Sequence, residues 1–289
     1  MSAAAVCRAP AASWSDADRI AALAERSLVL EIETYPKPGL VSHVDTGSHS
    51  DMDAATFARS AAVLRPFFAE LADAGARDAE MAALRKIGLR AEHAMLAATG
   101  GVNTHRGAIF GLGLLCAAAG ARVRGGAAGT PTLGAWVARR WGADILGGPR
   151  LPDSHGERAS RRYGVGGARR EAADGFATVY GIGLPALRRA VHDVPDDPEA
   201  ARVDACFALI AALDDTNLLH RGGQDGLDFA RATARAFVAR GGVRARDWRR
   251  HAVAAHRAFV ARRLSPGGAA DLLAMSLFVD AFDTGGGAR

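Results

Sequence analysis

The sequence predicts an all-α fold in a single compact domain. Hydrophobic residues make up 49% of the 289 residues, but aromatic residues only 6%. Alanine supplies much of the remainder and loses no side-chain entropy in a helix, which favours closely packed helices. Apolar residues recur at helical spacing, and no run of β-branched residues alternates as in a strand. A chain of this length without a linker-like stretch is expected to form one domain.

The first helix is predicted to begin after Ser15, which can act as an N-cap, and to end near Thr34, before two prolines. We expect residues 1–14 to be a disordered tail and residues 15–285 to form the all-α catalytic domain. The Gly-, Pro-, Arg- and Ser-rich stretch 144–168 is expected to be an irregular, functional connection. The other helices, which bring the total to roughly ten, are expected over about residues 52–74 (with a kink at Pro66), 78–98, 104–119, 131–142, 169–191, 198–213, 225–240, 245–263 and 268–283.

The net charge of +5 comes almost wholly from arginine, because Lys37 and Lys86 are the only lysines. An arginine-rich, alanine-rich composition is typical of a GC-rich genome. It also suits phosphate ligands, since a guanidinium group can form two parallel hydrogen bonds to an oxyanion. The arginines are scattered and are not interleaved with aromatic residues, so the sequence does not indicate nucleic-acid binding.

The three cysteines are far apart and do not have metal-binding spacing. The N-terminal residues lack the long apolar core of a signal peptide, and no stretch approaches the roughly 20 apolar residues of a membrane span. We therefore expect a soluble cytoplasmic protein without a membrane partner.

Polar residues interrupt the helical pattern in four places. The first is the loop 36–52, where Lys37 stands between two prolines and suits a fixed phosphate contact. Asp51 in this loop can either bind a ligand or cap the next helix. The second is 100–108, a Gly-rich turn that leads into a helix N-terminus, which can bind anions. His105 and Arg106 in its first turn oppose the helix dipole, which favours a bound anion over a simple cap.

The third polar segment, 214–223, begins with adjacent carboxylates at Asp214 and Asp215. Their mutual repulsion at a helix end could be relieved by Mg²⁺, which binds carboxylates together with substrate phosphates. The fourth is Ser-Pro-Gly-Gly at 265–268, which opens the last helix. Asp271 in that helix either complements the dipole or acts on substrate, and spacing alone does not decide between these roles.

Motifs of the common phosphate-binding and hydrolytic folds are absent from the sequence. It contains neither a GxSxG elbow nor a GxxxxGK[ST] phosphate loop, and no Rossmann fingerprint follows a strand. The zinc-binding patterns HExxH and CxxC are also missing.

Five runs, taken together and in this order, resemble the triphosphoribosyl-dephospho-CoA synthase family. They are YPKPGLVSHVDTGSHSDMDAATF (35–57), GVNTHRGAIFGLGLLCAAAG (101–120), HGERASRRYGVGGARREA (155–172), DDTNLLHRGG (214–223) and SPGGAADLLA (265–274). The words SHVD and GSHSDMD in the first run resemble the malonate decarboxylase branch more than the citrate lyase branch.

This resemblance implies an all-helical pentosyltransferase. ATP and 3′-dephospho-CoA would give 2′-(5″-triphosphoribosyl)-3′-dephospho-CoA and adenine, with Mg²⁺ bound to the ATP triphosphate. The product would be the precursor of the prosthetic group of malonate decarboxylase, which a downstream prosthetic-group transferase attaches to an acyl-carrier subunit. A homodimer is compatible with the sequence.

We expect Asp215, Asp271 and Asp214 to be the catalytic carboxylates, with Asp214 and Asp215 also as metal ligands. The residues expected to bind the substrates and their phosphates are Lys37, Gly39, His43, Asp45, Asp51, Thr104, His105, Arg106, Gly107, His155, Tyr163, Arg169, Glu171, Asn217, His220, Arg221, Gly222, Gly223, Ser265, Gly267 and Gly268.

Two other functions are compatible with these polar segments. One is a metal-dependent glycoside hydrolase of the ADP-ribose type, which would use water as the nucleophile. The absence of a GDxxGxxxE opening near the N-terminus counts against it. The other is a non-catalytic accessory protein that binds CoA or nucleotides, although anion binding alone would not call for two adjacent carboxylates.

Overall fold

The structure, a computed structural model, describes residues 15–125, 131–149 and 155–285, apart from the side chains of 155–157 and 160. The predicted tail 1–14 lies outside the described residues. Within them the chain forms twelve α-helices, one π-helical and one 3₁₀ turn, and no strand, which confirms the all-α prediction. The helices are α1 (Asp16–Ile32), α2 (Ala54–Ala76), α3 (Met81–Ala98), α4 (Arg106–Gly125), α5 (Leu133–Gly147), α6 (His155–Tyr163), α7 (Gly167–Ala173), α8 (Leu184–Asp193), α9 (Pro198–Ala212), α10 (Thr216–Ala239), α11 (Trp248–Ala261) and α12 (Gly267–Asp283).

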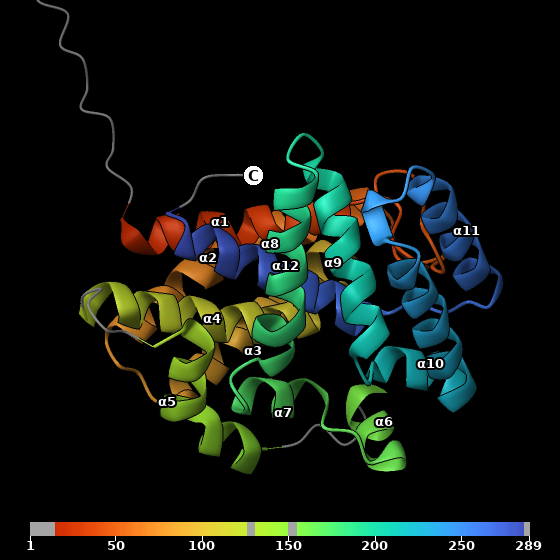
Figure 1. Cartoon of the computed structure of the whole chain (residues 1–289). Coiled ribbons are helices and arrows are strands. Elements are labelled where there is room, and N and C mark those ends of the chain that lie inside the picture. Colours follow the sequence, from red (N-terminus) through yellow and green to blue (C-terminus); the bar gives the residue numbers. More distant parts are fainter. Residues whose placement is uncertain (1–14, 126–130, 150–154, 286–289) are drawn as a thin grey trace, which may run out of the picture.

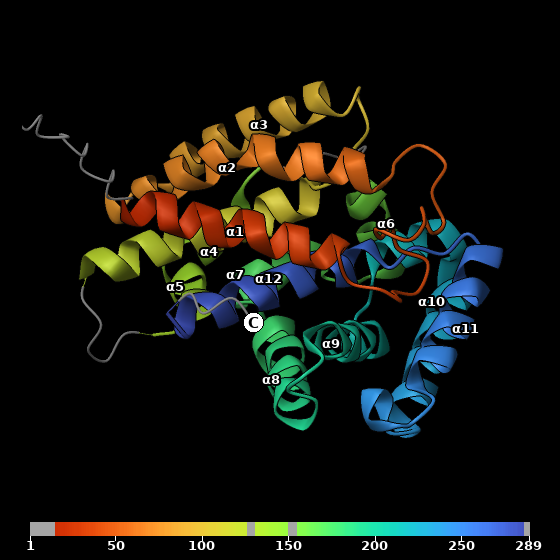
Figure 2. The same cartoon turned by 90° about the horizontal axis from the view of Figure 1, so that it is seen from above.

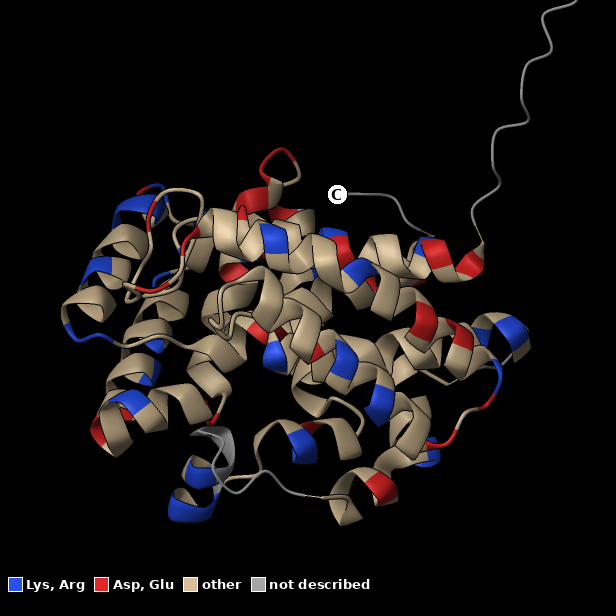
Figure 3. Ribbon diagram, turned by 180° about the vertical axis from the view of Figure 1, so that it is seen from behind, with Lys and Arg blue, Asp and Glu red and all other residues tan. Residues whose placement is uncertain are grey.

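Helices α1, α2 and α3 form an outer layer that covers α4 (Figure 2). Helices α8, α9, α10 and α11 lie on the other side of α12, and α5, α6 and α7 form the lower edge of the molecule in Figure 1. Basic and acidic residues are spread over most of these helices rather than gathered in one stripe (Figure 3).

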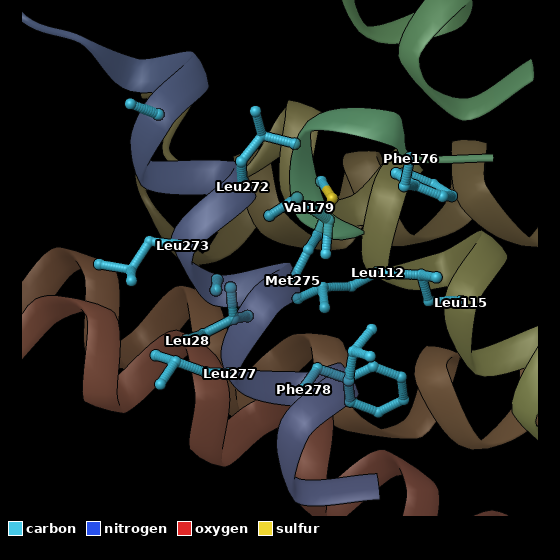
Figure 4. Packing of buried hydrophobic residues seen from close by; sticks show 14 of the residues in the cluster. Leu28, Leu112, Leu115, Phe176, Val179, Leu272, Leu273, Met275, Leu277 and Phe278 are labelled. Atoms are coloured by element: carbon cyan, nitrogen blue, oxygen red, sulfur yellow. The ribbon is translucent and has the colours of Figure 1, made fainter. Parts of the chain in front are cut away.

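The core is built around α4, α9 and α12, which are apolar on nearly all sides and are largely buried. A helix that is hydrophobic all round belongs in the interior of a protein. Figure 4 shows Met275 and Leu277 of α12 among buried side chains of its neighbours, which include Leu28 of α1, Leu112 of α4 and Val179 of the π-helical turn. This central position fixes the N-terminal end of α12, where Asp271 lies.

The sequence was expected to contain no stretch long and apolar enough to span a membrane, and helix α4 is an exception. It is long and apolar enough to cross a membrane by length and composition alone, which the sequence analysis did not anticipate. Most of it is buried inside the bundle, as is usual for the core helix of a globular protein.

The helix boundaries largely follow the predicted signals. Ser15 forms a capping box with Asp18, and their side chains bond each other's backbone N–H groups. Helix α2 begins at Ala54 and continues through Pro66. Its N-cap is Asp53, whose Oδ1 accepts the backbone N–H of Thr56 at 2.8 Å, so Asp51 does not cap it.

Three predicted segments were wrong in their detail. The stretch 144–168 was expected to be irregular, but α5 extends to Gly147 and α6 follows from His155. Its arginines and alanines are good helix formers, and α6 packs against α10. The polar composition of the stretch was therefore not sufficient reason to expect an irregular connection. The polar segment 214–223 is helical from Thr216, and Gly223, with φ +62°, interrupts the ladder without ending α10.

The third error is the single helix predicted over 169–191. Instead α7 ends at Ala173, a π-helical turn covers Val179–Gly183, and α8 follows. Gly175 has φ +78° and approaches the backbone of Gly134 in α5, a contact that a side chain would obstruct. The next residue, Phe176, also has a positive φ and is buried. This tertiary contact breaks a pattern that is locally compatible with one helix.

Candidate active site

The N-terminal ends of α4, α10 and α12 converge on one large cavity of about 1570 Å³. The cavity is larger than the roughly 300–1000 Å³ of a site for one drug-sized molecule, so it has room for two nucleotide-sized ligands. Helix N-termini carry unpaired N–H groups and a partial positive charge, which favour anions. Part of this donor capacity is already used by two of the protein's own carboxylates, Asp215 and Asp271.

Asp215 holds two helices together at the cavity wall. Its Oδ1 accepts the backbone N–H groups of Asn217 (2.8 Å) and Leu218 (3.3 Å) in α10. Its Oδ2 accepts the N–H of Ala269 in α12 at 3.0 Å, and Gly268 contributes a further backbone hydrogen bond. The side chain is almost fully buried, and burial raises its pKa against the effect of these donors. With these contacts, one carboxylate caps the N-terminal ends of both α10 and α12.

Asp214 points to a different partner. Its Oδ1 lies 2.8 Å from Nη2 of Arg231, and the side chain is more than half exposed. Because both oxygens of Asp215 accept backbone N–H groups, the two neighbouring carboxylates do not face a common point. Among the described residues, no group of three or more His, Cys, Asp or Glu side chains is arranged to hold a metal ion. The pair does not fit the protein-held magnesium site that the sequence suggested.

Asp271 lies against the first turn of α4. It accepts a hydrogen bond from the backbone N–H of Ala108. A Cβ on Gly107 would fall only 2.0 Å from its Oδ2, so only glycine lets the carboxylate approach this closely. The side chain keeps some exposure to the cavity. Burial, then the charges of Glu31 and Asp215, raise the pKa of Asp271 well above its ordinary value.

Glu31 is a site residue that the sequence analysis did not identify. It lies on the buried stripe of α1, lines the cavity and forms an ion pair with Lys37. Burial raises the pKa of Glu31, while the ammonium group of Lys37 lowers it. The signal was a carboxylate three residues after Leu28, at a position where the apolar stripe should continue.

Lys37 itself is buried with 1% exposure and does not line the cavity. Its position between two prolines directs it inward to Glu31 rather than towards a phosphate. Two other predicted residues of this loop also lie away from the cavity. His43 is exposed, and Asp45 pairs with Nε2 of the buried His256 at 3.2 Å. Gly39, with φ +67°, allows the loop to pack against the carbonyl oxygen of Leu264.

His49 and Arg221 form another part of the wall. His49 Nε2 lies 2.9 Å from Ser265 Oγ, and Arg221 Nη2 lies 3.2 Å from His49 Nδ1. Asp51 is 3.7 Å from the same nitrogen. The arrangement resembles a Ser–His–Asp triad, but Arg221 can only donate. Its contact needs Nδ1 as an acceptor, which favours the proton on Nε2, and in that tautomer His49 does not take the proton of Ser265.

Arg169 and Glu171, which were expected to bind the substrates, have structural contacts. Arg169 donates to four carbonyl groups at the C-terminal end of α5, including those of Leu146 and Gly148. Glu171 accepts from the backbone N–H and the hydroxyl of Thr178, at 2.7 and 2.8 Å. Both residues line the cavity, but their polar atoms form hydrogen bonds within the protein.

The structure brings most of the predicted site residues to this cavity. Its lining includes Asp51, Thr104, His105, Arg106, Gly107, Arg169, Glu171, Asp214, Asp215, Asn217, His220, Arg221, Ser265, Gly267, Gly268 and Asp271. It does not include Lys37, Gly39, His43, Asp45, Tyr163, Gly222 or Gly223. The side chain of His155 lies outside the described residues.

Comparison with known proteins gives a family match over nearly the whole chain. The family model described as ATP:dephospho-CoA triphosphoribosyl transferase matches residues 17–289. A protein of Stutzerimonas stutzeri (strain A1501), named probable 2-(5″-triphosphoribosyl)-3′-dephosphocoenzyme-A synthase, is 44% identical over 271 residues, which cover 92% of each chain.

Proteins of the same name from other organisms are also similar. That of Pseudomonas aeruginosa (strain UCBPP-PA14) is 44% identical over 90% of this chain and 89% of its own. That of Acinetobacter calcoaceticus is 37% identical over 90% of both chains. No solved structure matches the chain.

Proposed function

The chain belongs to the ATP:dephospho-CoA triphosphoribosyl transferase family, and on this basis we propose how its cavity works. It is a pentosyltransferase, a triphosphoribosyl-dephospho-CoA synthase, and the family implies ATP and dephospho-CoA as substrates. In the proposed reaction the ribose 2′-hydroxyl of 3′-dephospho-CoA attacks C1′ of the ATP ribose, and adenine leaves. The triphosphate stays intact on the transferred pentose.

The observation that carries this proposal is the position of Asp271. Displacement at C1′ passes through a transition state with oxocarbenium character, and the attacking hydroxyl needs a base. Asp271 faces the cavity and has one backbone donor, whereas Asp215 has four. A base is most effective when its pKa lies near the working pH. Burial and the charge of Glu31 move the pKa of Asp271 in that direction.

In this proposal the C1′–O bond forms as the C1′–N9 bond of ATP breaks. The electron pair of the broken bond goes to the adenine ring, which takes up a proton from water on release, while the proton of the hydroxyl goes to Asp271 and from there to water. Glu31 lines the cavity and Lys37 does not, so their ion pair presents its negative end to the site. That charge favours the positive character that develops on the pentose.

The triphosphate is expected near the arginines of the cavity wall, away from these carboxylates. Arg85 and Arg221 line the cavity, and guanidinium groups suit phosphate oxygens. Arg106 also lines it, but it lies beside Gly107 and is paired with Glu92. Mg²⁺ is proposed to enter as part of the ATP substrate. The different partners of Asp214 and Asp215 argue against a separate ion held by that pair.

Incubation of the purified protein with ATP, Mg²⁺ and 3′-dephospho-CoA tests the reaction, with adenine and adduct followed by chromatography and mass spectrometry. We expect adenine and the triphosphoribosyl adduct in equal amounts. Asp271→Asn should lower kcat by about 10²–10⁴-fold, the usual contribution of a general base. The value of kcat/KM for the parent should rise with pH through a pKa above the ordinary carboxyl range, because the base must be ionised.

Other outcomes have distinct meanings. Adenine without the adduct would identify a glycoside hydrolase, and dephospho-CoA binding without either product would identify a binding protein. If Asp271→Asn keeps full activity while Asp215→Asn loses it without loss of folding, the base has been assigned to the wrong carboxylate.

We further propose that the product serves malonate decarboxylase, through a prosthetic-group transferase and an acyl-carrier subunit. The support is the wording SHVD and GSHSDMD in the loop before α2. Genes for malonate decarboxylase subunits beside this one would support the proposal. Genes for citrate lyase subunits in that place would overturn it.

A further inference from the structure

Three polar side chains form a short hydrogen-bonded row between α2 and the beginning of α4. Thr104 Oγ1 donates to Ser60 Oγ at 2.8 Å, and Ser60 Oγ lies 2.6 Å from Nδ1 of His105. Ser60 and His105 are buried, with 0% and 3% exposure. Within the part of the chain that the structure describes, Nε2 of His105 has no hydrogen-bond partner, although His105 lines the cavity.

The tautomer of the imidazole ring follows from the direction of these bonds, with Thr104 as the donor to Ser60. A serine hydroxyl has one proton, and Ser60 receives the proton of Thr104 as an acceptor. Its own proton is therefore free to point at Nδ1 of His105. Because Nδ1 accepts, the ring proton of neutral His105 is on Nε2. The unpartnered atom is thus a donor, buried at the cavity wall.

His105 is also uncharged near neutral pH. Burial, and secondarily the positive charge of Lys37, lower its pKa to about 3. The ring of Phe57 meets it edge-on with centroids 4.9 Å apart, and its backbone N–H donates to Sδ of Met95 at 3.3 Å. Such an apolar pocket disfavours an imidazolium ion. His105 therefore cannot serve as the phosphate-binding cation that its sequence position suggested.

The surrounding charges point to the group that this donor meets. Asp271 packs on Gly107, two residues after His105, and Glu31 and Asp215 raise its pKa through their charges. Arg106, the residue after His105, is paired with Glu92. A triphosphate would therefore be repelled by the carboxylates here and attracted to arginines such as Arg85 and Arg221. The pentose and its base are uncharged, so they fit the part of the cavity beside Asp271 and Glu31. An uncharged ring nitrogen is then the acceptor that suits a neutral N–H donor.

We propose that Nε2–H of His105 donates a hydrogen bond to a ring nitrogen of the departing adenine, and that Ser60 is the positioning residue that keeps the proton on Nε2. This inference rests on the proposed function, in which adenine is the leaving group. The electron pair of the C1′–N9 bond enters the adenine ring, and N3 and N7 gain negative charge. His105 shares its proton with one of them and retains it, Asp271 takes the proton of the attacking hydroxyl, and adenine takes up a proton from water on release.

ATP analogues that lack one ring nitrogen test the contact directly. With ATP, His105→Phe should lower kcat about 100-fold with little change in KM, as for removal of a donor that acts in the transition state. With either 3-deaza-ATP or 7-deaza-ATP the parent should already be slow, and the same variant should lose little more. An equal loss with ATP and with both analogues would overturn the adenine contact. So would a loss confined to the KM for ATP, which would indicate a ground-state contact.

Two control measurements distinguish the proposed role of His105 from a structural effect of the substitution and from a failure of the proposed function. His105→Gln keeps an N–H donor of similar reach and should recover part of kcat, which a purely structural role does not predict. The parent must release adenine with ATP. If it does not, the proposed function fails, whereas an active parent with the wrong analogue pattern rejects only the role of His105.

The role of Ser60 has its own readout. In the parent, ¹⁵N NMR of the imidazole should show Nε2 protonated and Nδ1 unprotonated at neutral pH, and Nδ1 protonated instead would overturn the inference. Ser60→Ala should give a mixture of tautomers and lower kcat about 10-fold, because the donor is then only partly in place. Ser27→Ala is the matched control, since Ser27 is a buried helical serine whose hydroxyl donates to Leu23. Equal losses in the two variants would reject the positioning role.

Discussion

At the scale of single residues, three aspartates around the cavity have three different kinds of contact. Asp214 forms a surface ion pair, Asp215 caps two helices and Asp271 faces the substrate space. All three were equivalent candidates in the sequence, because a carboxylate reveals nothing of its partners. The number of N–H donors around each one separates a structural carboxylate from one available to a ligand.

The raised pKa of Asp271 predicts how stability depends on pH. Its folded pKa lies above its unfolded value, so the folded state binds this proton more tightly. The free energy of unfolding therefore falls as pH rises through the interval between the two values. Asp271→Asn mimics the protonated form and should be more stable than the parent at pH 8. This advantage should shrink as pH is lowered towards 4, as measured by urea denaturation.

Asp73→Asn provides the control, because Asp73 is exposed on α2. Its stability difference from the parent should stay small and nearly constant with pH. A parent that is more stable than Asp271→Asn at pH 8 would contradict the assignment of a disfavoured charge at this site.

At the scale of helices, α2 and α4 approach closely through a reciprocal pair of small residues. A Cβ on Gly75 would lie 1.9 Å from the carbonyl oxygen of Ala117, and one on Gly120 would lie 1.9 Å from that of Ala72. In each helix the alanine precedes the glycine by three residues, and the pairs match in antiparallel order. This crossing holds the first turn of α4, with His105 just before it, against Ser60 of α2.

We expect Gly75→Ala to destabilise the protein by about 1–3 kcal/mol, the usual cost of overpacking a close contact. The new methyl group would meet backbone atoms, which cannot rotate away as a side chain can. Gly147→Ala is the matched control, because a Cβ there has no heavy atom within 4 Å. It should leave stability unchanged or raise it slightly, since alanine is the better helix former. Equal denaturation midpoints for the two variants would show that α2 and α4 do not need this contact.

At the scale of the whole molecule, the cavity is formed by residues that are far apart in the chain. Glu31, His105, Asp215 and Asp271 come from the ends of four helices that the bundle brings together. A substrate that contacts all of them links the N-terminal and C-terminal parts of the chain. Binding of the substrate should then raise the free energy of local unfolding in both parts of the chain.

Hydrogen–deuterium exchange can measure this coupling. ATP with Mg²⁺ should slow exchange together in the first turns of α4, α10 and α12, because local opening of any of them would break ligand contacts. The C-terminal half of α8 does not line the cavity and serves as the internal reference. Protection of only one of the three helix ends would contradict a single shared site.

The sequence by itself determined the helical fold, most helix ends and the segments that carry the site. Periodicity, capping residues and prolines act over a few residues, so they can be recognised without the rest of the chain. The five matching runs identified the family, and three of them, 101–120, 214–223 and 265–274, contain the helix N-termini that meet at the cavity.

Only the tertiary structure decided the direction and the partners of each side chain. It buried Lys37 against Glu31, saturated Asp215 with backbone donors and left Asp271 facing the cavity. It also placed Ser60 beside His105, 45 positions away in the sequence, where the two side chains are in hydrogen-bond contact. The physical reason is that burial and hydrogen bonding set the charge and the availability of a polar group, and both depend on residues from distant helices.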